Sequence, residues 1–166
     1  MFRYKPNRLG IVGTGKVKTR LTRWLEFQHF FYLFSVRKPV RSLCQALIPF
    51  SAGKMALEIY LEKSSSYLNN LTPSEFMNKA EDFLEESLGP DFLIKTIEKQ
   101  ISLTSFNNVL VDEIETEKEA KAINQLGFYL IGIGPEGKRD FVNAFIDDTD
   151  EPEAAKRLEE IFINLV

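Results

Sequence analysis

Apolar positions recur along the chain with two alternating periods. Short continuous apolar runs, rich in Val, Ile, Leu and Phe, are typical of strands that are buried on both faces of a sheet. Two compact runs are RLGIV at 8–12 and NVLVD at 108–112, and an aromatic run lies at 29–36. The runs predict strands at 8–12, 29–36, 108–112, 128–133 and 141–146.

Apolar residues at helical spacing separate these runs and predict the helices. Two helix starts carry a capping box, formed by Thr72 with Glu75 and by Thr116 with Glu119. Gly127 is typical of the residue that follows a helix. The predicted helices cover residues 16–27, 39–47, 55–61, 73–88, 93–101, 117–126 and 151–165.

Strands that alternate with helices predict an α/β fold, in which a parallel sheet is flanked by helices on both faces. We expect a single domain over residues 1–166, with a helical insertion around 51–104. In folds of this class, ligands bind at the carboxyl ends of the strands. Residues that directly follow a strand are therefore the first candidates for a functional site.

Composition excludes several classes of protein. Of the 166 residues, 44% are hydrophobic and 27% are charged, a balance that is ordinary for a globular domain. No apolar stretch approaches the roughly 20 residues of a membrane helix, and we expect no secretory signal at the N-terminus. Cys44 is the only cysteine, so we expect no internal disulfide and a cytoplasmic location. His29 is the only histidine, which excludes a His-rich zinc site.

Charge is distributed unevenly along the chain. Residues 1–41 hold ten Lys or Arg residues and one acidic residue, a balance of +9. The remaining residues hold eleven basic and twenty-three acidic residues, a balance of −12. A basic segment beside an acidic remainder indicates an anionic ligand held by the N-terminal segment. Charge balance within the molecule is the alternative interpretation.

One motif carries recognisable chemistry. Residues Gly10 to Lys16 have the spacing GxxxxGK, after a predicted strand and at the start of a predicted helix. The glycines let backbone N–H groups turn toward a phosphate, and the lysine reaches the terminal phosphates. A Ser or Thr that holds Mg²⁺ normally follows the lysine, but Val17 stands at that position. A glycine-rich turn that binds no ligand is the alternative.

Four segments follow one another in the order of a known family. They are the loop at 10–18, the segment SVRKPVR at 35–41, the segment GPDF at 89–92, and the segment VDEIETEKEA at 111–120. In this order they resemble the phage deoxynucleoside monophosphate kinases, a family of P-loop kinases, from about Arg8 to Ile133. The resemblance implies a three-layer P-loop kinase-like fold. It also implies transfer of the γ-phosphoryl group of ATP to a deoxynucleoside monophosphate with Mg²⁺.

Three positions depart from that family in the same direction. Val17 cannot ligate a metal, and Ser74 and Glu115 stand where the family has arginines. Loss of one transition-state arginine costs roughly 10³–10⁵ in the rate of phosphoryl transfer. The sequence therefore favours a non-catalytic or weakly active relative of these kinases, acting as a nucleotide-binding or protein-interaction module. An active deoxynucleoside monophosphate kinase is the alternative.

The resemblance implies two sets of site residues. The residues assigned to catalysis are Lys16, Asp112, Arg41 and Arg139. The residues assigned to the phosphate-binding loop are Gly10, Gly13, Thr14, Gly15, Lys16, Val17 and Lys18. The residues that would bind a metal ion are not determined by the resemblance. For the two arginines the alternative is an ordinary polar surface, and for Asp112 it is an exposed acid before a turn.

The two candidate functions imply different partners. A working site binds a nucleotide or a deoxynucleoside monophosphate, with ATP and Mg²⁺ as cofactors. A degenerate site needs neither cofactor and leaves an unidentified protein as the partner. A homodimer stays open, a membrane is not expected, and the acidic remainder of the chain argues against nucleic acid. If the chain is encoded by a phage, the expected location is the cytoplasm of the host cell.

Overall fold

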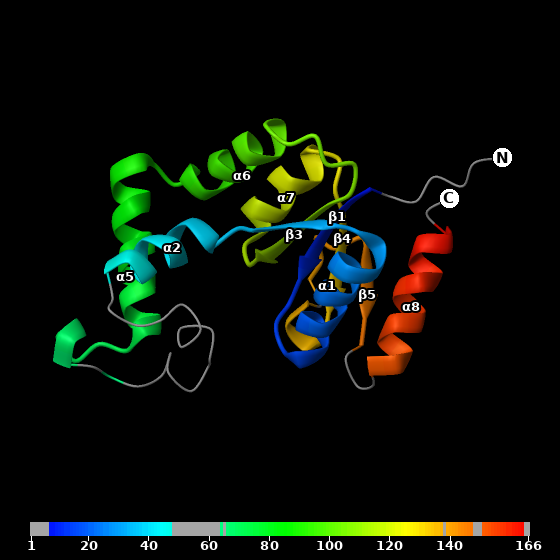
Figure 1. Ribbon diagram of the computed structural model, residues 1–166, viewed down its shortest axis with the longest axis horizontal. Helices are drawn as coiled ribbons and strands as arrows, with labels where there is room; N and C mark the ends of the chain where they lie inside the picture. Colours follow the sequence, from blue (N-terminus) through cyan, green and yellow to red (C-terminus); the bar gives the residue numbers. More distant parts are fainter. Residues whose placement is uncertain (1–6, 48–63, 65, 138, 148–150, 165–166) are drawn as a thin grey trace. The chain divides into compact units, whose positions relative to one another are not determined.

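The computed structural model describes residues 7–47, 64, 66–137, 139–147 and 151–164 (Figure 1). Its strands are β1 (Arg8–Val12), β2 (Tyr32–Ser35), β3 (Val109–Ile114), β4 (Tyr129–Ile133) and β5 (Ala144–Ile146). Its α-helices are α1 (Lys16–His29), α2 (Lys38–Leu47), α5 (Pro73–Leu88), α6 (Phe92–Ser102), α7 (Glu117–Gln125) and α8 (Glu151–Asn164). Two short 3₁₀ helices are η1 (Ser66–Leu68) and η2 (Pro135–Gly137).

The strands form one five-stranded sheet in the order β2-β3-β1-β4-β5. Every pair of neighbouring strands is parallel, as the alternation of strands and helices predicts. β1 lies at the centre, where Leu9 aligns with Leu110 of β3 on one side and with Tyr129 of β4 on the other. The prediction of an α/β fold with a parallel sheet flanked by helices is confirmed.

Alternate residues of β1 contact different helices. Ile11 belongs to a buried cluster that includes Leu25 of α1 and Leu158 of α8, so these two helices cover one face of the sheet. Gly10 points the other way, because a Cβ atom at Gly10 would meet the side chain of Ile123 in α7. The chain leaves β1 and β3 in opposite directions along the sheet, and right-handed crossovers then place α1 and α7 on opposite faces.

Contacts divide the chain into two compact units. Unit 1 comprises Met1–Val36 and Ile97–Val166, and its described part contains the whole sheet with α1, α7 and α8. Unit 2 comprises Arg37–Thr96 and is helical wherever it has regular structure among the described residues. The expected helical insertion at 51–104 overlaps unit 2, which begins earlier with α2. Within the described residues, no helix is long and apolar enough to cross a membrane.

Several predicted boundaries agree with the structure, and some are wrong. Both capping boxes are present, with Thr72 and Thr116 as the capping residues. The prediction that His29 begins a strand is wrong: α1 continues through His29 and ends at Phe30, whose left-handed φ of 55° turns the chain before β2. β3 also runs two residues beyond the predicted end at Asp112. The helix predicted at 55–61 lies outside the described residues.

The connection between β4 and β5 is unusually short for two parallel strands. It spans residues 134–143, of which the described ones hold η2 as their only helix, whereas such a crossover usually needs a dozen or more residues. The short path brings backbone atoms of Gly132, Gly137 and Val12 close together. A Cβ atom at Gly132 would overlap the carbonyl oxygen of Gly137, and a Cβ atom at Gly137 would lie 2.7 Å from the carbonyl oxygen of Val12. Glycine is therefore required sterically at this crossing.

We expect Gly132→Ala to lower the free energy of unfolding by about 2–3 kcal/mol, because rigid backbone rather than a mobile side chain blocks the added methyl group. Gly127→Ala is the matched control, since φ is +85° there but nothing lies within 4 Å of the added atom. Backbone strain alone predicts a loss of about 1 kcal/mol for that control. Chemical denaturation measures both, and equal losses would show that the crossing is less tightly packed than described.

Candidate functional site

A pocket opens at the carboxyl ends of β1 and β3. These adjacent strands are followed by crossovers that run in opposite directions, which is where ligands bind in open parallel sheets. The cavity has a volume of about 420 Å³ and is lined by residues that all belong to unit 1. That volume lies at the low end of the roughly 300–1,000 Å³ found for small-molecule sites. The pocket can therefore hold one small ligand.

One wall of the pocket is the turn between β1 and α1. It consists of Gly13, Thr14 and Gly15, all of which line the cavity. Gly13 has φ of 120° and Gly15 has φ of 97°, values that favour glycine over any other residue. Gly15 caps α1 without a side-chain hydrogen bond, and the first turn of α1 carries no acidic residue. The backbone N–H groups at this helix start therefore face no carboxylate of their own helix, which favours an anion nearby.

Gly10 lies outside this turn. It is buried in the middle of β1, where a Cβ atom would overlap the side chain of Leu130. Its role in the structure is thus to let β1 pack against its neighbours. The three residues 13–15 alone connect the strand to the helix. The GxxxxGK spacing spans half a strand and a short turn rather than one continuous loop.

The three residues that open α1 point to different surroundings. Lys16 is exposed and does not line the pocket. Val17 is partly buried and packs against the hydrophobic core. Lys18 lines the pocket, yet its side chain is only 11% exposed. The structure therefore brings Lys18, and not Lys16, to the cavity.

Lys18 forms a buried ion pair with Asp112. Its Nζ donates a hydrogen bond to Oδ2 of Asp112 at 2.6 Å, and the carboxylate side chain is 8% exposed. The other oxygen of Asp112, Oδ1, is buried and has no hydrogen-bond partner. Removing one member of such a pair leaves an uncompensated buried charge, at a cost of about 3–5 kcal/mol. In this structure the positive charge of Lys18 is thus compensated by Asp112.

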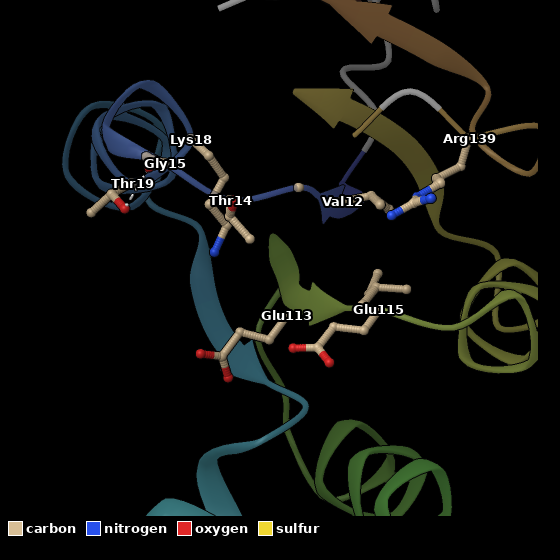
Figure 2. Close-up of a pocket in the computed structure, with 10 residues that line it drawn as sticks. Val12, Thr14, Gly15, Lys18, Thr19, Glu113, Glu115 and Arg139 are labelled. Carbon is tan, nitrogen blue, oxygen red and sulfur yellow. Dashed lines mark hydrogen bonds between the residues drawn. The ribbon is translucent and has the colours of Figure 1, made fainter. Parts of the chain in front are cut away.

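A bulge in β3 forms the wall opposite the turn. The register of β1 against β3 shifts between Gly10 and Val12, so that β3 contains one extra residue. Glu113 lies in this shift and has φ of 60°, a left-handed value that is costly for a residue with a side chain. Both Glu113 and Glu115 line the pocket. Figure 2 shows the two glutamates on the same side of the view.

Arg139 completes the described lining. It follows η2 and is exposed, and Figure 2 shows it on the opposite side of the view from Lys18. Arg41, also expected at the site, is partly buried in α2 of unit 2. The sequence motifs assign no binding role to Thr19 or Glu113, although both line the pocket. Thr19 lines the cavity, and its hydroxyl donates to the carbonyl oxygen of Gly15 at 3.0 Å.

The described residues do not fit a resident metal ion. Within the described part of the chain, no group of three or more His, Cys, Asp or Glu side chains could hold one. Val17, at the position where a metal-binding hydroxyl was sought, faces the core, and Asp112 is held by Lys18.

Comparison with protein-family models, with curated proteins and with solved structures finds no match to this chain.

The negative charge of Asp112 extends beyond its ion pair. Burial and the nearby Asp112 carboxylate raise the pKa of Glu26, two turns along α1 from Lys18, whereas Arg23 lowers it to a smaller extent. Glu75 shows the opposite effect: its Oε2 accepts a hydrogen bond from the Thr72 backbone N–H at 2.7 Å, which lowers its pKa. These two glutamates should respond to pH with opposite signs.

We expect Glu113→Gly to raise the free energy of unfolding by up to about 1 kcal/mol. Relief of about 1–2 kcal/mol of left-handed strain exceeds the roughly 0.4–1 kcal/mol of added chain entropy. Glu115→Gly is the matched control, because it removes a neighbouring pocket carboxylate where φ is not positive. That variant should lose about 0.5–1 kcal/mol. Thermal unfolding tests both, and a loss at Glu113 as large as that at Glu115 would contradict the strained bulge.

We expect Glu26→Gln to stabilise the protein near pH 7. A raised folded pKa means that wild-type stability falls as pH rises from the ordinary carboxyl range through the folded pKa, and glutamine removes that fall. The gain should disappear in acid, where Glu26 is protonated in both states. Glu75→Gln should instead lose stability near pH 7, with the loss fading as pH falls through the folded pKa. The two variants are compared by unfolding curves measured from about pH 3 to about pH 8, a range that includes the ordinary carboxyl pKa values. If their stabilities change with pH in the same direction, the opposite pKa shifts of Glu26 and Glu75 are contradicted.

Proposed function

We propose that this protein is a non-catalytic nucleotide-binding module that takes a nucleoside monophosphate in the pocket beside α1. The observation that carries the proposal is the composition of the pocket. One wall is a glycine turn at a helix start, and the other holds Glu113 and Glu115, while Lys18 is committed to Asp112. These features support binding of a phosphate group without its transfer.

Binding is supported on the side of the glycine turn. Backbone N–H groups at a helix N-terminus and the positive end of the helix dipole stabilise a phosphate. Arg139 lines the same cavity and adds a guanidinium that can hold phosphate oxygens in bidentate geometry. The carboxylates of Glu113 and Glu115 can accept hydrogen bonds from hydroxyl or amino groups, which the sugar and the base of a nucleotide provide.

Transfer is disfavoured by the charges of the same residues. Phosphoryl transfer needs positive charge around the transferred group, since the protein contributes mainly positioning and electrostatics. In the described lining the charge of Lys18 is compensated, and Arg139 shares the cavity with two glutamates. A triphosphate adds more negative charge to this cavity than a monophosphate does, so a monophosphate is the better ligand. The resemblance to deoxynucleoside monophosphate kinases supports the same ligand class.

The test is calorimetry with deoxynucleoside monophosphates and with ATP, each with and without Mg²⁺. We expect a monophosphate to bind at least about tenfold more tightly than ATP, equivalent to about 1.4 kcal/mol. Arg139→Ala should weaken binding about fivefold or more, because a charge-assisted contact is lost. Lys156→Ala removes an exposed base on α8, away from the lining residues, and should leave the affinity unchanged.

A second measurement separates binding from catalysis. Incubation with ATP, Mg²⁺ and each monophosphate should form no ADP above the protein-free rate. Formation of ADP that depends on a monophosphate would overturn the proposal in favour of an active kinase. Absence of binding by every nucleotide would also overturn it and would direct attention to a protein partner.

A further inference from the structure

We infer that Asp112 is an electrostatic lock on Lys18, which sets the affinity of the pocket for a phosphate group. In the locked state Lys18 neutralises Asp112, and an entering phosphate must compete with that carboxylate for the lysine. The inference rests on the proposed function only in that a phosphate group enters this same pocket. It adds a positioning residue, since Asp112 acts on a ligand through Lys18.

The position of Lys18 supports the competition. Lys18 lines the pocket together with Gly13 and Gly15, whereas Asp112, which accepts its hydrogen bond, is absent from the lining. Figure 2 shows the Lys18 side chain extending from α1 into the region between Thr14 and Glu113. A lysine ammonium has three N–H donors on a flexible stem, and one of them is used by Oδ2 of Asp112. The same group can therefore be shared with, or transferred to, an anion in the cavity.

The surroundings of Asp112 explain why the lock is strong. Its Oδ2 accepts a short charge-assisted hydrogen bond from Lys18 at 2.6 Å, and its Oδ1 is buried without a hydrogen-bond partner. Among the described ion pairs, Lys18 is thus the side chain that compensates the charge of Asp112. If Lys18 moved away completely, a buried charge would stay uncompensated, which is strongly unfavourable. A weak anion therefore does not displace the carboxylate, whereas a phosphate dianion competes best.

The test uses inorganic phosphate as the probe and the full chain. Asp112→Asn keeps the shape of the side chain and removes its charge, so that Lys18 is available to the anion. We expect Asp112→Asn to bind phosphate at least tenfold more tightly than the wild type does. A purely structural role for Asp112 predicts unchanged or weaker binding, because damage to a site does not raise its affinity.

Two further variants show where such a gain comes from. Lys18→Met combined with Asp112→Asn should lose the gain, because the released ammonium is then missing. Glu159→Gln removes one exposed negative charge from α8, outside the pocket lining, and should change phosphate affinity less than about threefold, as for an exposed charge. If Glu159→Gln tightens binding as much as Asp112→Asn does, the effect is general electrostatics and the lock is refuted.

A measurement on the wild-type chain keeps the inference testable if Asp112→Asn does not fold. The ammonium resonance of Lys18 should shift as phosphate is added, and that of Lys156 on α8 should not. An unchanged Lys18 resonance at saturating phosphate would refute the competition. The outcomes are also separate from those of the proposed function. If the wild type binds a nucleotide but Asp112→Asn shows no gain in phosphate affinity, only the lock is refuted. If Asp112→Asn gains phosphate affinity but no nucleotide binds, only the proposed nucleotide ligand is refuted.

Discussion

The buried ion pair between Lys18 and Asp112 joins the two elements on which the pocket depends. Lys18 belongs to the first turns of α1, and Asp112 to the strand next to β1, so their contact ties the helix start to the sheet. The position of the glycine turn at 13–15 follows, because this turn connects β1 to that helix. The bulge in β3 comes directly after Asp112, at Glu113, which lines the cavity. The ion pair therefore links the two walls of the pocket.

The architecture could be predicted from sequence because its signals are local. Buried parallel strands show as apolar runs, and the boxes at Thr72 and Thr116 mark helix starts through contacts three residues apart. Boundaries failed where the deciding interaction is not local. The end of α1 depends on a left-handed Phe30, and the extension of β3 depends on its pairing with β1. No periodicity in the sequence encodes a register shift between strands that lie about a hundred positions apart.

The candidate site was likewise predictable where it depends on local sequence signals and was not where it depends on the fold. Gly13, Thr14, Gly15, Lys18 and Arg139 were expected at the site and line the pocket. The motif spacing suggested Lys16 as the central lysine, but the helix begins at that residue and turns the next lysine inward.

The uneven charge of the chain also has a partial explanation within the molecule. Lys18 with Asp112, and Arg37 with Glu81, each join the basic N-terminal segment to the acidic remainder. Intramolecular balance therefore accounts for part of the asymmetry.

The strand order has a consequence for the way in which the chain reaches its native state. β1 and β2 are consecutive in sequence but do not pair, and both pair with β3, which begins only at Val109. The ladder between Arg8 and Val109 closes a loop of about a hundred residues, whose entropy must be lost before the contact forms. During synthesis the first two strands therefore have no described sheet partner until β3 leaves the ribosome. The aromatic segment around Phe31 and Phe34 therefore cannot be buried against β3 during that interval, so the order of synthesis delays the burial of this apolar surface.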